Sequence, residues 1–251
     1  MKNKFWGEFM KQESVLCFSR FLLEDRYGCF EGISFNKDYA HLVMNEHNYI
    51  FVDREQAERD NHYKQIIPYA IFINENREIL NYKRGDSSGE NRLKSLRSIG
   101  IGGHINEVDI LNWQNAPNRI MIYHGHESHE DDNMAYETVV FDNLCNYGLF
   151  REIEEELKLG NMRYKEMVDA LQIDCIRSSP LAFINEEDTD VGKVHFGVVY
   201  VLRINEKLIN SFEENVIVDA QFSSYDKIKK EIDFYENWSQ LCLKNWSKLE
   251  G

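Results

Sequence analysis

The chain has 251 residues, 43% of them hydrophobic, which allows one large domain or one domain with an extension. Its formal net charge of −14 argues against non-specific binding to DNA or RNA, because that binding depends on lysines and arginines that neutralise phosphates. The five cysteines include no C-x-x-C pair, and the sequence has neither an 18-residue apolar span nor a basic-then-apolar leader. Free thiols, no membrane partner and a cytoplasmic location are therefore expected.

An N-terminal α+β extension is expected over residues 1–64, where aromatic and charged residues are mixed without a repeat. Residues 53–58 have the composition of a short helix. Large apolar side chains in this part would be exposed if it stood alone, so it is predicted to pack on a main domain at 65–251. These side chains are Phe18, Phe21, Leu22, Leu23, Phe30 and Phe51.

Three strands are predicted at the start of the main domain. The first covers residues 65–73, and its Pro68 favours the start of a strand or a sheet edge. A turn at 74–76 leads to the second strand at 78–84, and a loop at 85–89 follows. Alternating small and branched residues from Ser98 predict a third strand that ends in Gly102 and Gly103, where the backbone can approach a ligand closely.

The next segment, about 110–136, contains one predicted strand at 119–123 and an acidic loop with three histidines. His124, His126 and His129 form an H-x-H-x-x-H pattern that lacks the spacing of a helix-borne metal-binding pair, so a polar loop is favoured. A helix is predicted to begin between Tyr136 and Leu144. The elements predicted beyond Gly160 are helices at 164–171, 225–231 and 235–249, and strands at 173–177, 181–184, 194–204 and 216–222.

The predicted helix contains the run R-E-I-E-E-E-L from Arg151 to Leu157. Because residues three and four apart are neighbours on a helix, Glu152, Glu155 and Glu156 fall within an arc of roughly 100°. Crowded carboxylates repel one another unless a cation lies among them, and Mg²⁺ prefers oxygen ligands. Taken alone, the run is more often a solvated acidic helix face. The glycine turn upstream favours the metal site. An apolar stripe lies beside the acids: Leu149, Phe150, Ile153 and Leu157.

The glycine turn followed by this helix resembles the signature of the Nudix hydrolases, a family of MutT-like phosphohydrolases. Gly103 and Arg151 are 48 positions apart, which exceeds the family spacing and predicts an insertion inside the Nudix motif, at about 110–136. The family motif has a further Glu between the glycine turn and the arginine. Its position falls on Asp109 when counted forward from Gly103, and on Asn143 when counted back from Arg151. A glycine near the end of the family motif is replaced by Lys158. Gly160 is the expected helix C-cap.

The resemblance implies an α/β fold, the Nudix-type α/β/α sandwich with a mixed sheet, over about residues 65–249. It also implies hydrolysis of a phosphoanhydride bond in a nucleoside diphosphate linked to another moiety. The implied cofactor is Mg²⁺, with Mn²⁺ as a substitute, and a small anionic substrate is compatible with the acidic chain because a bound cation inverts the local electrostatics. The implied ligands are Glu152, Glu155, Glu156 and the carbonyl of Gly102.

Within this implied site, Glu152 is either the third ligand or the base for a metal-bound water. Arg151 is expected to pair with one of the carboxylates and to fix its position, the alternative being a surface ion pair. Arg84, Arg92 and Arg97 are candidate phosphate ligands. His104 either contacts the substrate or, more often in such a place, hydrogen-bonds the turn. A further catalytic acid is expected from a loop, and the sequence does not choose among Glu186, Glu187, Glu213 and Glu214.

Two other functions stay open. A non-catalytic nucleotide-binding regulator on the same fold is favoured by the insertion and by Lys158, whereas the retained acids argue against it. An isomerase would need acid–base residues that the sequence does not identify. A homodimer is the default expectation for the assembly.

Overall fold

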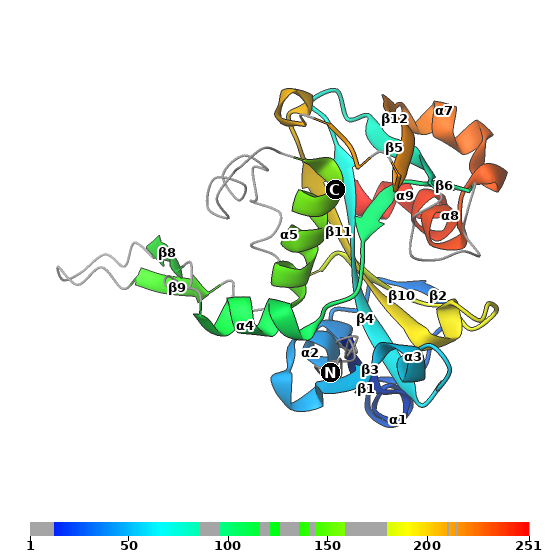
Figure 1. The fold of residues 1–251 in the computed structure, drawn as a ribbon. Coiled ribbons are helices and arrows are strands. Elements are labelled where there is room, and N and C mark those ends of the chain that lie inside the picture. Colours follow the sequence, from blue (N-terminus) through cyan, green and yellow to red (C-terminus); the bar gives the residue numbers. More distant parts are fainter. Residues whose placement is uncertain are drawn as a thin grey trace, which may run out of the picture.

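The computed structural model describes residues 13–85, 96–115, 121–125, 136–140, 144–158, 180–209, 211–213 and 215–250. Within these ranges the centre of the molecule is a ten-stranded mixed sheet, whose longest path runs β12-β5-β4-β11-β10-β2 (Figure 1). The strands of this sheet are β1 (Ser14–Ser19), β2 (Gly32–Ser34), β3 (Ile50–Asp53), β4 (Tyr63–Ile73), β5 (Ile79–Arg84), β6 (Arg97–Ser98), β7 (Gly100–Gly102), β10 (Ala182–Asn185), β11 (His195–Arg203) and β12 (Ile217–Ser223).

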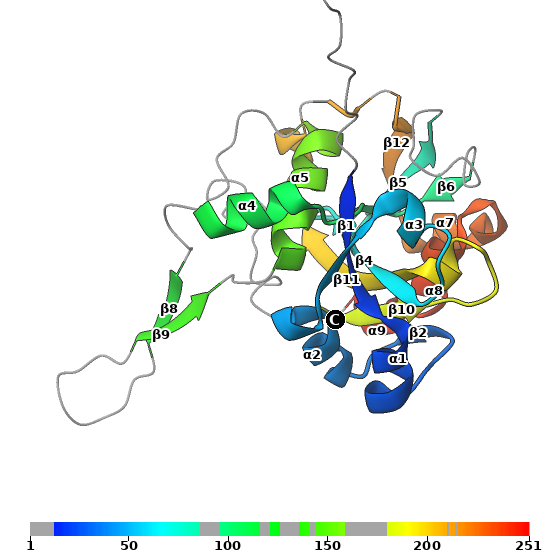
Figure 2. The same ribbon diagram turned by 60° about the horizontal axis from the view of Figure 1, so that its bottom comes forward.

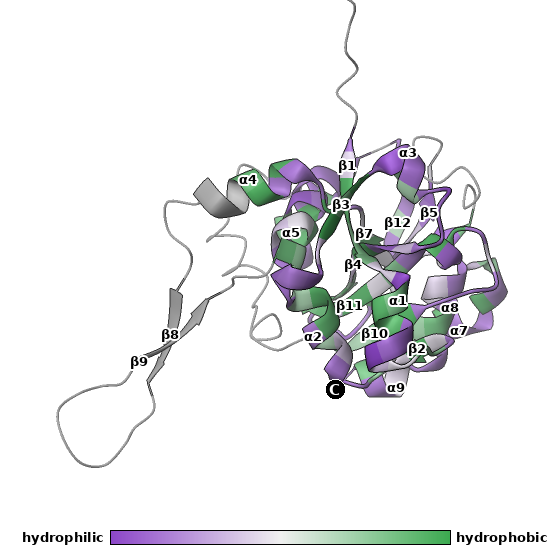
Figure 3. Cartoon of the chain, turned by 90° about the horizontal axis from the view of Figure 1, so that it is seen from below, coloured by the Kyte–Doolittle hydropathy of each residue, from purple (hydrophilic) through white to green (hydrophobic). Residues whose placement is uncertain are grey.

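Helices cover both faces of the sheet. The α-helices are α1 (Arg20–Leu22), α2 (Asp38–Met44), α3 (Arg54–Ala57), α4 (Glu107–Asn115), α5 (Leu144–Leu157), α7 (Tyr225–Lys230), α8 (Asn237–Lys244) and α9 (Trp246–Leu249). Shorter helical turns are η1 (Leu23–Tyr27), η2 (Glu46–Asn48), η4 (Gly192–Val194), η5 (Glu206–Leu208) and η6 (Ile232–Phe234). In Figure 3, β10 and β11 are mainly hydrophobic, whereas the outer helix α3 is largely hydrophilic.

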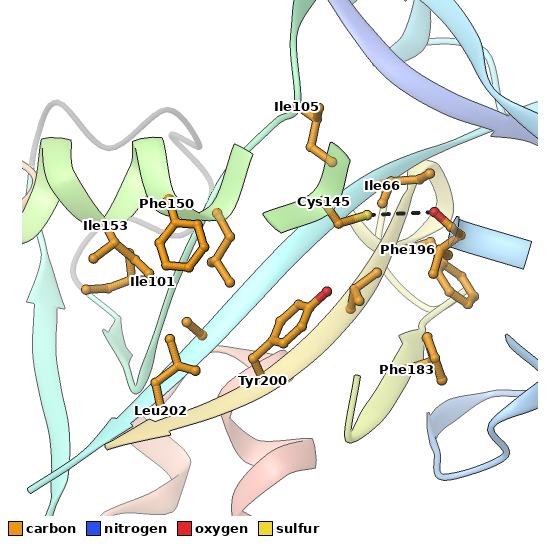
Figure 4. Packing of buried hydrophobic residues seen from close by; sticks show 14 of the residues in the cluster. Ile66, Ile101, Ile105, Cys145, Phe150, Ile153, Phe183, Phe196, Tyr200 and Leu202 are labelled. Carbon is orange, nitrogen blue, oxygen red and sulfur yellow. Dashed lines mark hydrogen bonds between the residues drawn. The ribbon is translucent and has the colours of Figure 1, made fainter. Parts of the chain in front are cut away.

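The central pair β4 and β11 explains why the sheet is buried on both faces. These strands run parallel, from His195 opposite Gln65 to Arg203 opposite Ile73. Side chains alternate along a strand, so Phe196, Val198, Tyr200 and Leu202 pack toward α5, while Val199 and Val201 pack toward α8 and α9. Figure 4 shows Phe150 and Ile153 of α5 facing Tyr200 and Leu202. The predicted α/β/α sandwich with a mixed sheet is confirmed.

Residues before Lys64 belong to the same sheet. β1 pairs antiparallel with β4, and β2 pairs antiparallel with β10. The ring of Phe196 lies 5.2 Å from the ring of Phe18 and 6.0 Å from that of Phe30, measured between centroids. Tyr39 also packs against Phe196. Aromatic contacts thus join the N-terminal segment to β11.

The segment between the glycine turn and α5 holds more regular structure than the sequence predicts. The strand predicted at 119–123 is β8 (Met121–Gly125), which pairs with an unpredicted β9 (Tyr136–Val140) in a separate two-stranded sheet. Figures 1 and 2 show this sheet beyond the unpredicted helix α4, away from the main sheet. The acidic helix begins at Leu144, inside the predicted range. The elements predicted at 164–171 and 173–177, the residues His126 and His129, and Gly160 lie outside the described residues.

Two predictions about local structure are wrong. Pro68 lies in the interior of β4, between a stretch that pairs with β1 and a stretch that pairs with β7. A position between two pairing stretches tolerates the missing N–H. The helix predicted at 235–249 is divided at Asn245, whose backbone leaves the helical region at φ −114° and ψ 19°. Its side-chain amide donates to the carbonyl of Leu241 at 3.0 Å, which competes with the helix.

Cys17, Cys29, Cys145 and Cys242 are free thiols, and Cys175 lies outside the described residues. None of the described helices is both long enough and apolar enough to cross a bilayer.

Replacing Phe196 with Ala should destabilise the N-terminal segment and the rest of the fold together. Phe→Ala in a packed core costs about 3–5 kcal/mol of the free energy of unfolding. Urea denaturation followed by circular dichroism measures this loss. Phe234→Ala is the matched control, because that ring is 67% exposed, and it should change stability by less than about 0.5 kcal/mol. Equal midpoints for the two variants would contradict the packing described for Phe196.

Candidate active site

A cavity of about 440 Å³ opens where the glycine turn meets α5. The turn contributes Gly102, Gly103 and His104, and α5 contributes Arg151, Glu152 and Glu156. The opposite wall comes from the loop after β10, the first residue of β11 and the start of α8. Segments far apart in the sequence therefore converge on one space.

Both positions of the turn, Gly102 and Gly103, require glycine because neighbouring atoms lie very close to their backbone. A Cβ atom at Gly102 would overlap the carbonyl oxygen of Pro68 on β4. A Cβ atom at Gly103 would overlap the carboxylate of Glu152. The turn can lie directly against the helix acid only because neither residue has a side chain.

The buried Asp109 of α4 holds the half-buried side chain of Arg151. The guanidinium donates from Nε to Oδ1 of Asp109 at 2.9 Å and from Nη2 to Oδ2 at 3.2 Å. Asp109 is 1% exposed, and its Oδ2 also accepts from the backbone N–H of Asn106 at 2.9 Å. This bidentate pair fixes α4 against α5.

The other N–H groups of the Arg151 guanidinium hydrogen-bond the glycine turn and the carboxylate of Glu152. Nη2 donates to the carbonyl of His104 at 2.8 Å, and Nη1 donates to Oε1 of Glu152 at 2.9 Å. A longer contact of 3.3 Å reaches Glu155. Burial opposes the charge on Arg151, but Asp109 and Glu152 outweigh it and raise the pKa of the guanidinium. Arg151 therefore pairs with the carboxylates of Asp109 and Glu152.

Glu152 and Glu156 face the cavity as a pair of poorly solvated acids. Oε2 of Glu156 is buried and has no hydrogen-bond partner in the part of the chain that the structure describes. Burial and the charge of Glu152 raise the pKa of Glu156 to about 8, although Arg84 acts in the opposite direction. Burial also raises the pKa of Glu152, against the effect of Arg151. A buried carboxylate oxygen without a partner, next to a second carboxylate, fits the donor set of a divalent cation.

Glu155 differs from its two neighbours. Its side chain is 59% exposed, and it is not among the residues that line the cavity. The structure thus brings together two of the three helix acids and the glycine turn.

The wall near Arg84 is a buried polar network. Arg84 donates to Glu236 at 3.2 Å, and Glu236 also accepts from Ser98 at 2.6 Å and from Tyr69 at 3.2 Å. Trp238 packs edge-on against Tyr69 and also lines the cavity. Neither Glu236 nor its donors Ser98 and Tyr69 are predicted from the sequence, because they come from the residue before α8, from β6 and from β4.

Arg97 does not line the cavity. Its guanidinium lies over the ring of Tyr235 and donates to Asn81. Arg92 lies outside the described residues.

The candidate loop acids differ in whether they line the cavity. Glu186 lines the cavity, and its carboxylate accepts from the N–H of Thr189 at 2.6 Å and from the Thr189 hydroxyl at 2.8 Å. Glu187 pairs with Arg20 and Lys64, and Glu213 pairs with Lys158. Glu214 is not described.

Glu58, His104 and His195 form a cluster that the sequence does not predict, and its two histidines line the cavity. Nε2 of His104 lies 3.1 Å from Nε2 of His195, and Oε1 of Glu58 lies 3.6 Å and 3.7 Å from these two atoms. Of the two histidines, His104 was considered only as a substrate contact or a support for the turn. No sequence spacing connects the three residues.

Comparisons with known proteins show which fold this chain shares. No family model matches the sequence. Protein YmaB of Bacillus subtilis is 27% identical over 193 residues, covering 76% of this chain and 74% of that protein. The crystal structure of Tm1382, a candidate Nudix hydrolase, aligns with a TM-score of 0.62 and 21% identity over 93% of this chain and 98% of that chain. The chain has the Nudix hydrolase fold.

A Nudix hydrolase from Alicyclobacillus acidocaldarius aligns with a TM-score of 0.45 and 9% identity over 75% of this chain and 92% of that chain.

The departures from the Nudix motif have structural explanations. Asp109, reached by counting forward from Gly103, makes the contact to Arg151, and Asn143 is not described. Lys158, at the position of the family glycine, follows the last residue of α5 with φ +45°. This is the left-handed region that glycine favours at a helix C-terminus.

Asp109→Ala should destabilise the metal-free protein by about 3 kcal/mol, the low end for a broken buried ion pair, because Arg151 keeps its other partners. Chemical denaturation in the presence of a chelator measures the loss. Glu155→Ala removes a mostly exposed partner of the same guanidinium and should cost less than about 1 kcal/mol. A loss for Asp109→Ala no larger than that of the control would refute the structural role of the pair.

Proposed function

We propose that the protein is a Mg²⁺-dependent hydrolase that cleaves a phosphoanhydride bond in a nucleoside diphosphate linked to another moiety. The supporting observation is the convergence of Glu152, Glu156 and the Gly102–Gly103 turn on one cavity, with a buried oxygen of Glu156 that lacks a hydrogen-bond partner among the described residues. The Nudix fold supports the same reaction class by analogy.

Glu152, Glu156 and the Gly102 carbonyl would hold the cation, with Glu155 as a further ligand that would have to turn toward the cavity. The chemistry supplied by bound Mg²⁺, or by Mn²⁺ in its place, is neutralisation of charge on the diphosphate and a lowered pKa of the attacking water. Arg151 positions Glu152 through its hydrogen bond of 2.9 Å. Among the loop acids, Glu186 is the candidate for the additional catalytic carboxylate because it lines the cavity.

The cavity is suited to a small molecule rather than a polymer. About 440 Å³ falls within the roughly 300–1,000 Å³ typical of small-molecule sites. Arg84 offers positive charge for a phosphate, and Trp238 offers an aromatic surface beside it. His104 is the other candidate substrate contact, at the end of the glycine turn.

Glu156→Gln should lower the Mg²⁺-dependent diphosphatase rate by about 10²–10³-fold or more, because it removes charge that would hold the cation next to the developing negative charge. Product release from a panel of nucleoside diphosphate derivatives measures the effect. Glu154→Gln is the matched control on the same helix turn, since Glu154 is exposed and does not line the cavity; it should retain the full rate. Equal turnover by Glu156→Gln and the wild type would end the proposal.

The second candidate is a nucleotide-binding regulator without turnover. The exposed position of Glu155 favours it, because only two of the three helix acids face the cavity. Calorimetry that detects tight binding of a nucleoside diphosphate derivative, with no product after long incubation with Mg²⁺, would support the regulator against the hydrolase.

A further inference from the structure

Glu58, His104 and His195 form a compact set of metal-ligating atoms, and of the three only His104 has a place in the proposed hydrolase, as a candidate substrate contact. Glu58 follows the end of α3, His104 follows the glycine turn, and His195 is the first residue of β11. Within the described ranges, this is the group of histidine, cysteine or acidic residues whose ligand atoms all lie within 4.8 Å of one another. Three separate elements therefore contribute one ligand atom each.

The distances match one face of a tetrahedron around a metal ion. Metal–nitrogen and metal–oxygen bonds of about 2.0–2.1 Å with tetrahedral angles place neighbouring ligand atoms about 3.3–3.4 Å apart. The observed separations are 3.1 Å between the two Nε2 atoms, and 3.6 Å and 3.7 Å from these atoms to Oε1 of Glu58. Small shifts of the side chains are enough to equalise these distances.

The hydrogen bonds around His195 prepare its Nε2 atom for a cation. Nδ1 of His195 lies 2.7 Å from the carbonyl oxygen of Val191, which can only accept, so Nδ1 carries the proton. In the neutral ring, Nε2 then presents a lone pair toward His104 and Glu58. Metal-binding histidines commonly have this arrangement, with the second nitrogen held by a carbonyl or carboxylate.

The described part of the chain supplies three protein ligands, and the cavity gives access for a fourth ligand. The His195 side chain is 5% exposed, the His104 side chain 14% and the Glu58 side chain 24%. Both histidines line the cavity that also contains Glu152 and Glu156. A fourth ligand can therefore reach the cluster from the cavity.

We propose that Glu58, His104 and His195 bind one borderline transition-metal dication, of which Zn²⁺ is the representative, with its open position toward the cavity. The choice of ion follows from the ligands, because two imidazoles and one carboxylate suit Zn²⁺, whereas Mg²⁺ prefers an all-oxygen set. The site shares no side chain with the acidic pair of α5 and does not depend on the proposed hydrolase activity.

The alternative is a cluster joined only by hydrogen bonds, in which one imidazole donates to the other and Glu58 accepts. Such a cluster has no selectivity for Zn²⁺ and would bind it no better than exposed histidines do. Metal binding therefore separates the two explanations without any activity measurement.

The test titrates Zn²⁺ into the chelator-treated full chain by calorimetry and measures bound metal after dialysis. The wild type should bind one Zn²⁺ per chain at this site, and Co²⁺ in its place should give the visible absorption spectrum of a tetrahedral site. Glu58→Gln, His104→Gln and His195→Ala should each weaken binding by at least about 100-fold, because even partners outside the ligand set cost about 10–100-fold when removed.

Two control variants make the result specific. His62→Ala removes a histidine whose side chain is 86% exposed, and Glu156→Gln removes an acid of the other site; both should keep the Zn²⁺ affinity of the wild type. Thermal melts check that each variant is folded, and the partly exposed Glu58 and His104 allow the test even if His195→Ala does not fold. The proposal is overturned if the wild type binds no Zn²⁺, if Glu58→Gln and His104→Gln bind it as tightly as the wild type, or if Glu156→Gln weakens binding as much as they do.

Discussion

The half-buried guanidinium of Arg151 is the group on which the geometry of the site depends. It joins three elements at once, because it donates to Asp109 of α4, to Glu152 of its own helix and to the carbonyl of His104 after the glycine turn. A charge taken out of water is tolerated only when such partners surround it. The directions of these hydrogen bonds fix the turn relative to α5, and so they fix the distance between the backbone of the turn and the helix acids.

The position of the cavity follows from the sheet. β4 changes partner from β1 to β7 at Pro68, and the carbonyl of that residue lies directly against Gly102. The parallel pairing of β4 with β11 brings His195 opposite Gln65, at the same end of the sheet as the N-terminal strand β1. The cavity is therefore lined both by carboxylates of α5 and by the imidazoles of His104 and His195, which are different kinds of metal ligand.

Elements with strong local periodicity were predictable. β4, β11 and α5 each show an apolar pattern of the right period, and each was predicted within a few residues of its observed bounds. β1 and β2 pair with β4 and β10, which lie far away along the chain, so no local pattern identifies them. β9 pairs with the neighbouring strand β8 and was not predicted either. The break at Asn245 was missed for another reason: one side-chain hydrogen bond outweighs a continuous apolar stripe.

The sequence by itself determined that Glu152 and Glu156 lie on one helix face beside an apolar stripe, because four residues make about one turn of helix. It also determined that a glycine pair precedes them. Only the tertiary structure decided that Asp109 is the partner of Arg151, that Glu155 lies outside the cavity and that Glu58, His104 and His195 meet. These contacts join residues tens of positions apart, and strand pairing and core packing, rather than spacing along the chain, bring them together.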